Sequence, residues 1–283
     1  MEELEGKFSL TSLNYRRDVH MKKIQIFCGL GHNSGSSHIA FNYSLLMAKK
    51  NKKVLYVAVG NNINTSIYSF PSQFEIRKND NIRNINMVSI EQMLDYQRIH
   101  SKDNSISVSS VFTKQLDVSW RWLTLDSEKN VLNVINPIEK YYDLIVVDLP
   151  SLNENMSLSE LIKRTTEQPP IDVLSIRHSI VAMDRLLYLK QQRQIDDHTY
   201  ICLTDYDPSG FMTYKKMVSW FKTYHVSVNK AKNSLHVRSI IYSNKKIFDQ
   251  VELNSVPLIF LENKKIKFFD DFRHTLLKIE KKV

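Results

Sequence analysis

A run of small residues between an apolar stretch and an amphipathic stretch is the part of this chain best suited to chemistry. The run is "GLGHNSGSSH", Gly29 to His38, and it follows "KIQIFC". Glycines let a loop curl so that several backbone N–H groups point at one anion, and the N-terminus of a following helix adds its positive dipole. The residues therefore predict a phosphate-binding loop between a strand and a helix.

The cation that such a loop normally carries is missing. In phosphate-binding loops a lysine reaches the β- and γ-phosphates, and a serine or threonine hydroxyl after it holds magnesium. Here Ser36 stands where the lysine is expected, while Ser37 keeps the hydroxyl and His38 could touch a phosphate at the helix start. The alternative is a small-residue junction that binds nothing. With Gly31 and Gly35, these three residues form the expected phosphate contacts.

Strand and helix patterns alternate along the chain and indicate an α/β fold. Continuous apolar runs without alternation, such as "KKVLYVAV", are typical of strands covered on both faces. We expect a doubly wound, mostly parallel sheet with helices on both faces, in a single domain at 21–283 after a leader at 1–20. Strands are predicted at 23–28, 52–59, 141–150, 171–179, 199–208 and 236–243, and helices at 37–51, 179–194, 211–225, 244–254 and 264–282. From 60 to 137 the pattern is weaker. There we expect an irregular insert, then a helix capped by Ser89, and then a second helix with a short strand before 134.

Several blocks in sequence resemble the ParA/MinD family of deviant P-loop ATPases. "SHIAFNYSLLMAKKNKKVLYVAVG" is similar to the family's helix and second strand, with Asn42 at its asparagine, and "YYDLIVVDLPS" is similar to the strand that ends in the Walker B aspartate. The resemblance covers about residues 21–280. It implies a P-loop NTPase-like fold and a nucleotide site for ATP or ADP with magnesium.

The same resemblance shows which functional residues have changed. The lysine that crosses to the partner subunit matches Gly31, and the phosphate-gripping lysine matches Ser36. The two aspartates after the second strand match Ala58 and Gly60. The magnesium positions match Ser37 and Asp148, and the residues near the base match Thr204 and Asp205. Phosphoryl transfer depends on positioning and charge stabilisation, so the loss of both lysines should leave turnover negligible.

The resemblance therefore implies a degenerate, cytoplasmic pseudo-ATPase that binds nucleotide weakly or not at all. We expect a role in positioning, partition or assembly, such as plasmid or chromosome partition or placement of a pilus, secretion or conjugation apparatus; pilus-assembly members of the TadZ/CpaE type, with altered loops, are a close analogy. The expected partner is a protein of such a system, with non-specific DNA, a homodimer and, less favoured, a membrane surface as further partners.

Charge supports an alternative function, a nucleic-acid-binding module that ignores nucleotide. From Gly210 to Val283 the chain holds 15 Lys/Arg and 6 Asp/Glu, whereas the preceding residues hold 24 of each. Such asymmetry favours an anionic partner, although a solvated lysine-rich face would look the same. The expected contacts are Lys215, Lys216, Lys222, Lys245 and Lys246.

Some patterns have a structural and a functional interpretation. "SWRW" (119–122) and "VSWFKTYH" (218–225) place aromatic residues beside bases, as single-strand binders do, but core packing explains them equally well. The apolar stripe of the last helix could lie on a membrane, although closing the sheet is favoured. Cys28 and Cys202 read as buried reduced thiols, and no histidines or cysteines have metal-site spacing.

Overall fold

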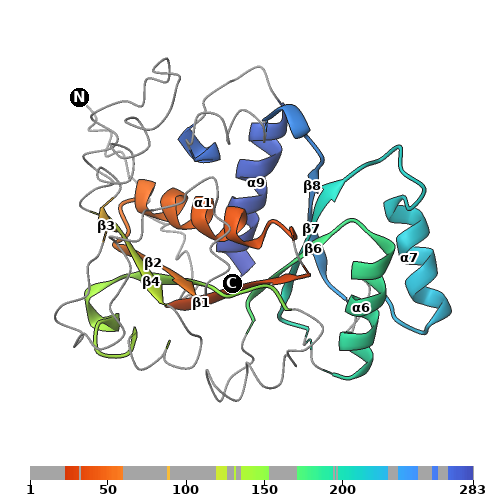
Figure 1. The fold of residues 1–283 in the computed structure, drawn as a ribbon, viewed down its shortest axis with the longest axis horizontal. Coiled ribbons are helices and arrows are strands. Elements are labelled where there is room, and N and C mark those ends of the chain that lie inside the picture. The colour runs from red at the N-terminus through yellow and green to blue at the C-terminus, as the bar shows by residue number, and fades with distance from the viewer. Residues whose placement is uncertain are drawn as a thin grey trace, which may run out of the picture.

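One mixed sheet of eight strands forms the centre of the protein (Figure 1). This computed structural model describes residues 23–31, 33–59, 88–89, 119–125, 131, 135–152, 171–193, 195, 197–228, 235–247, 257–260 and 267–282. The strand order is β3-β4-β2-β5-β1-β6-β7-β8, and every neighbouring pair is parallel except β3 and β4. The strands are β1 Ile24–Leu30, β2 Val54–Val59, β3 Val88–Ser89, β4 Trp120–Leu125, β5 Leu144–Asp148, β6 Val173–Arg177, β7 Tyr200–Tyr206 and β8 Val237–Tyr242.

Helices cover both faces of this sheet, as the alternating pattern predicted. The described α-helices named in Figure 1 are α1 Ser36–Lys49, α6 Ile180–Gln191, α7 Tyr214–Thr223 and α9 Lys267–Lys282, with short 3-10 helices at Glu139–Tyr141 and Leu258–Phe260 (η5). Apolar side chains of α1, η5 and α9 form one core with one face of the sheet. Those of α6 and α7 form a second core with the opposite face. The doubly wound α/β fold is therefore confirmed.

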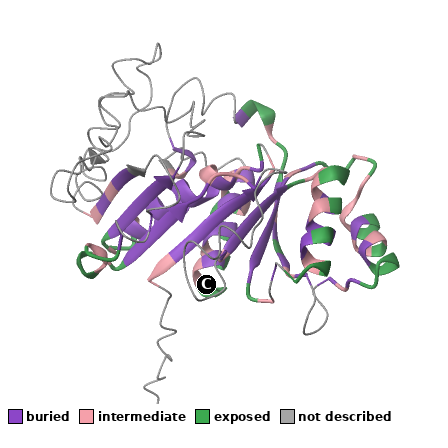
Figure 2. Cartoon of the chain, turned by 60° about the horizontal axis from the view of Figure 1, so that its bottom comes forward, coloured by how far each residue is buried: buried purple, intermediate pink, exposed green. Residues whose placement is uncertain are grey.

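Burial explains why the central strands read as continuous apolar runs. All six residues of β2 and all five of β5 are buried, and Figure 2 shows this as an unbroken buried band through the sheet. A strand covered on both faces has no solvent-facing side and therefore no alternation. The six predicted strands are all present, within a few residues of the predicted ends. Among the described helices, none is long and apolar enough to cross a membrane.

Of the two aromatic patterns with a suggested nucleic-acid role, "SWRW" belongs to the core and "VSWFKTYH" is only partly buried. Trp120 and Trp122 of "SWRW" lie in β4 with 0% and 2% of their surfaces exposed. Trp120 Nε1 donates to Ser44 Oγ at 2.9 Å, which anchors the strand to α1. The stacking interpretation of "SWRW" is therefore wrong, because both rings are covered. In "VSWFKTYH", Phe221 is fully buried and Trp220 is partly buried.

The last helix closes one face of the sheet. Phe268, Phe272, Leu276 and Ile279 of α9 are buried in the core that α1 shares. The apolar stripe is thus covered by the protein, and the membrane interpretation of this stripe is wrong. Cys28 and Cys202 are buried free thiols, as predicted, and burial raises the pKa of each to about 12.

Several predicted features lie outside the described residues. These are the leader at 1–20, the helix predicted after Ser89, the residues Gly60 and His32, and most of the predicted 244–254 helix, of which 245–247 is helical. Ser89 itself, the predicted cap, lies in strand β3. The segment before 134 contains the strand β4, where a helix with a short strand was expected.

Candidate functional site

The loop between β1 and α1 has the curled backbone that its glycines predicted. Gly31 has φ 84° and Gly35 has φ 75°, and Asn33 between them has φ 56°. A side chain built on Gly31 would meet nothing within 4 Å, so the conformation and not the space requires glycine there. Gly35 caps α1, and its carbonyl accepts the Ile39 N–H at 3.1 Å. The first-turn N–H groups, which have no acceptor within the helix itself, thus follow the loop directly.

Contacts from the segment that follows β5 hold the loop against β1. The Gly31 N–H donates to the Leu152 carbonyl at 3.2 Å, and the Leu152 N–H donates to the Gly29 carbonyl at 2.7 Å. A Cβ on Gly29 would lie 2.0 Å from Ser34 Oγ and 2.6 Å from Ser151 Oγ. A side chain at position 29 would therefore force both serine hydroxyls to move. The sequence analysis missed this constraint because Ser151 comes from a distant part of the chain.

Ser36, at the lysine position, is the first residue of α1 and is almost fully buried. It is 4% exposed, and its Oγ has no hydrogen-bond partner among the described residues. Ser34 Oγ is also buried and also has no hydrogen-bond partner among the described residues. Both hydroxyls are neutral, so neither replaces the charge of a lysine.

His38 does not restore the missing charge either. Burial lowers the pKa of the His38 imidazole to about 4, so the ring is neutral at neutral pH. A neutral imidazole can donate one hydrogen bond but carries no point charge for a phosphate. The predicted phosphate contact of His38 would thus be a hydrogen bond at most.

Asp148 lies at the carboxyl end of β5, below the start of α1. Its Oδ2 accepts a hydrogen bond from the Tyr56 hydroxyl at 2.7 Å, and it is 5% exposed. Burial raises the pKa of Asp148 to about 6, although the hydroxyls of Tyr56 and Ser37 both favour its charged form. The predicted magnesium residues Ser37 and Asp148 are therefore brought together.

Tyr56 is a site residue that the sequence analysis missed. It belongs to β2, two residues before Ala58, the buried residue at one of the family's aspartate positions. The only sequence signal was a phenol within a fully apolar run, because a buried hydroxyl needs a hydrogen-bond partner. Among the described residues there is no group of three or more His, Cys, Asp or Glu side chains that could hold a metal. Magnesium would depend on Ser37, Asp148 and oxygens of its ligand.

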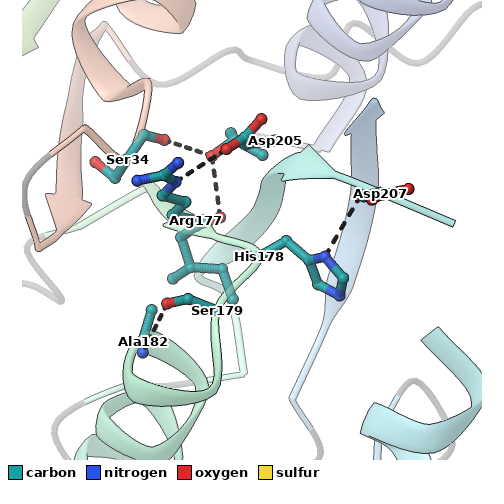
Figure 3. A network of polar contacts seen from close by, with 9 residues as sticks. Ser34, Arg177, His178, Ser179, Ala182, Asp205 and Asp207 are labelled. Atoms are coloured by element: carbon teal, nitrogen blue, oxygen red, sulfur yellow. Dashed lines mark hydrogen bonds and ion pairs between the residues drawn. The ribbon is translucent and has the colours of Figure 1, made fainter. Parts of the chain in front are cut away.

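Thr204 and Asp205 extend the site to the end of β7, and Figure 3 shows Asp205 beside Arg177. Thr204 Oγ1 lies 2.8 Å from the Ser34 carbonyl oxygen and 3.1 Å from that of Ile176. Its hydroxyl therefore ties the loop to β6 and β7. Asp205, with φ 53°, accepts a hydrogen bond from Arg177 Nε at 2.9 Å, and both side chains are partly exposed. Arg177 was not anticipated by the sequence analysis.

A second arginine contacts Leu152, which is hydrogen-bonded to the loop. Arg185 of α6 donates from Nη1 to the Leu152 carbonyl at 2.6 Å, the same oxygen that accepts the Gly31 N–H. Gly31 matches the family's cross-subunit lysine, so a guanidinium of this chain lies one carbonyl away from that position. The sequence analysis did not predict this contact either.

The five lysines predicted to bind an anionic surface are all exposed. Lys215, Lys216 and Lys222 lie on α7, whereas Lys245 and Lys246 lie in the short helical turn after β8, apart from α7 in Figure 1. Their partner remains a prediction.

Comparison with known proteins places this arrangement in a fold family. No protein-family model and no curated protein sequence matches the chain. Solved structures do match. MinD in the MinC:MinD cell division complex of Aquifex aeolicus has a TM-score of 0.55 at 13% identity, covering 93% of this chain and 97% of that one. A ParA family ATPase of Chlorobium tepidum has a TM-score of 0.55 at 13% identity, and the match covers 90% of this chain and 99% of that one. MinD of Pyrococcus horikoshii in complex with Mg-ADP has a TM-score of 0.53 at 12% identity, and the match covers 91% of this chain and 96% of that one. This protein therefore has the fold of the ParA and MinD ATPases.

Proposed function

We propose that this protein is a ParA/MinD-like pseudo-ATPase that acts in positioning, partition or assembly. The observation that carries the proposal is a phosphate loop with the required backbone and without its cation. Gly31 and Gly35 keep positive φ, but Ser36 is a buried neutral hydroxyl and His38 is a neutral ring. The fold supports the role, because the structures it matches include cell division and plasmid partition proteins.

The loop can still bind phosphate weakly. The N–H groups of Ser36, Ser37 and His38 lie at the N-terminus of a 14-residue helix, where backbone donors and the helix dipole favour an anion. Ser37 and Asp148 supply one hydroxyl and one carboxylate, the oxygen donors that magnesium prefers. Magnesium bound there would neutralise phosphate charge. Thr204 and Asp205 stand at the edge where a base would lie.

Hydrolysis should be negligible because the family's two lysines and one of its aspartates are replaced in this sequence. Ala58 replaces one aspartate, and the described loop residues carry no lysine. Loss of one preorganised donor to a developing charge costs about 3–4 kcal/mol in activation free energy. Loss of several would reduce turnover to the background rate.

Purified protein tests this proposal in two measurements. Phosphate release from Mg-ATP should equal the buffer blank, and ADP or ATP with magnesium should raise the melting temperature, since a ligand that binds only the folded state stabilises it. Ser37→Ala should reduce the magnesium-dependent part of that rise, whereas Ser243→Ala, at an exposed turn, should not. Turnover at rates typical of the family, abolished by Ser37→Ala, would contradict the proposal.

The positioning role has its own test. A fluorescent fusion should concentrate at discrete sites in cells that normally make the protein, and pull-down should recover a protein partner. A uniform distribution with no partner would argue against this role while leaving the nucleotide chemistry untouched.

A further inference from the structure

One stretch of the chain carries almost all of its net positive charge. From Pro208 to Phe248 there is no Asp or Glu, and there are eight basic residues against a net charge of +9 for the whole chain. Six of the eight lie in the described residues, and all six are exposed. None of the six makes an ion pair with a described carboxylate. These six are Lys215, Lys216, Lys222, Arg238, Lys245 and Lys246.

The outward face of α7 presents hydrogen-bond donors and no carboxylate. Residues 215, 216, 219, 222 and 223 are exposed, at the spacing of one helix face, while Met217 and Phe221 are buried in the core behind them. Lys215 and Lys222 are seven residues apart, or about 10 Å along the helix axis. Lysine and serine side chains of this kind contact phosphates without reading sequence.

Three aromatic rings are exposed in the same stretch of the chain. Phe211, at the loop before α7, is 79% exposed, Tyr224 after α7 is 46% exposed, and Tyr242 at the end of β8 is 44% exposed. Most large apolar side chains of a folded protein are not exposed to this extent. Three exposed rings in one acid-free stretch are available for contact with a partner.

Each ring is held in place by a neighbour. Lys216 Nζ lies 4.5 Å from the Phe211 ring centroid and donates to the Phe211 carbonyl at 3.0 Å. Tyr224 packs edge-to-face on Trp220, with centroids 5.3 Å apart. Tyr242 packs in the same way on Tyr206 at 5.5 Å. The rings are thus oriented before any ligand binds, which reduces the entropy lost on binding.

We propose that these cations and rings, which we name the α7–β8 surface, bind single-stranded nucleic acid. A single strand offers both phosphates for the lysines and unpaired base faces for the rings. In a duplex the base faces are stacked inside, so exposed rings would have no partner there. The cations lie on α7, on the edge strand β8 and in the turn after it, and Figure 1 shows this turn apart from α7. A flexible strand can bridge cations that lie on separate elements.

The chain contains a matched control for the ring–lysine pairs. Tyr141 is 61% exposed and has Lys140 Nζ 5.1 Å from its centroid, but it follows Glu139 and lies outside the α7–β8 surface. Tyr141→Ala removes the same kind of pair from a place where no strand should bind. Phe211→Ala and Tyr224→Ala remove exposed rings, so neither should lower the melting temperature.

Fluorescence anisotropy with labelled oligo(dT), oligo(rU), a duplex of equal length and anionic phosphatidylglycerol vesicles tests the proposal on the full-length protein. Phe211→Ala and Tyr224→Ala should each weaken single-strand binding roughly 5- to 100-fold, while Phe211→Trp retains it. Tyr141→Ala should bind as the unchanged protein does. Lys215→Glu and Lys222→Glu should weaken binding and flatten its salt dependence, by about 0.7 in the log–log slope per lost contact. Preference for DNA or RNA would show whether the 2′-hydroxyl is read.

Three outcomes would overturn the proposal. These are no binding at low salt, duplex binding as tight as single-strand binding with the ring variants unaffected, and binding to vesicles in place of oligonucleotides. The assay contains no ATP or ADP, so its result is independent of whether the phosphate loop binds nucleotide.

Discussion

At the scale of single residues, charge decides what the phosphate loop can do. Ser36 and His38 occupy the first turn of α1 without a positive charge, because one is a hydroxyl and the other is a ring whose pKa burial lowers to about 4. The absence of lysine from the loop was evident from the sequence. The neutral state of His38 was not, because it depends on the residues that bury the ring.

Gly31→Ala should destabilise the protein by about 1–2 kcal/mol, the penalty for a left-handed conformation in a residue with a Cβ. Gly31 has φ 84° and free space around its missing Cβ, so no steric contact adds to this value. Urea denaturation measures the change. Gly31→Asn should lower the free energy of unfolding by less, because asparagine adopts a positive φ more readily than alanine does. An alanine variant as stable as the unchanged protein would show that the loop does not need the positive φ.

Asp148→Asn should stabilise the protein at pH 8 and lose this advantage on acidification. The pKa of Asp148 in the folded state is about 6, against an ordinary value of 3.8. The folded state therefore holds this proton more tightly than the unfolded state, so stability falls as the pH rises from about 4 to 6. Above pH 6 the charged carboxylate costs roughly 3 kcal/mol, which asparagine avoids.

Thermal or urea unfolding of the unchanged protein and of Asp148→Asn, from pH 4 to pH 8, tests the direction of this pH dependence. The difference in the free energy of unfolding should grow with pH up to about 6 and then stay constant. Tyr56→Phe should act in the opposite direction at pH 8, since it leaves the buried carboxylate without its donor. A pH-independent difference for Asp148→Asn would mean that this carboxyl titrates normally.

At the scale of elements, α1 connects the loop to the rest of the molecule. Eleven of its residues are buried, so it is an interior helix with no broad polar face. Asn42 is buried within it, donates from Nδ2 to the His38 carbonyl at 2.8 Å, and accepts the Ile259 N–H at Oδ1 at 2.9 Å. The asparagine that the resemblance picked out thus ties α1 to η5.

Leu276→Ala in α9 should lower the free energy of unfolding by about 2–5 kcal/mol, the usual range for a leucine removed from a core. Leu276 is fully buried against the sheet face that α1 also covers. Lys278→Ala, an exposed position of the same helix, should change stability by less than about 0.5 kcal/mol. Chemical denaturation separates the two. Equal, small effects would mean that α9 does not pack on the sheet.

At the scale of the whole molecule, the parallel sheet gathers the site at one edge. The loop follows β1, Asp148 ends β5, Arg177 ends β6, and Thr204 lies near the end of β7. These strands are neighbours in the order β5-β1-β6-β7, so their carboxyl ends meet. In doubly wound folds ligands bind at this edge. The same edge would hold the phosphates and the base.

The sequence by itself determined the element types outside 60–137, the two covered faces of the sheet, the loop and its missing lysine. These follow from local periodicity and from residue identity, which need no knowledge of distant contacts. Only the tertiary structure decided the contacts that complete the site. Tyr56 and Asp148 are 92 residues apart, and Thr204 and Ser34 are 170 apart. Each pair meets only once the strands have settled into one order and register, and that register depends on packing over the whole sheet.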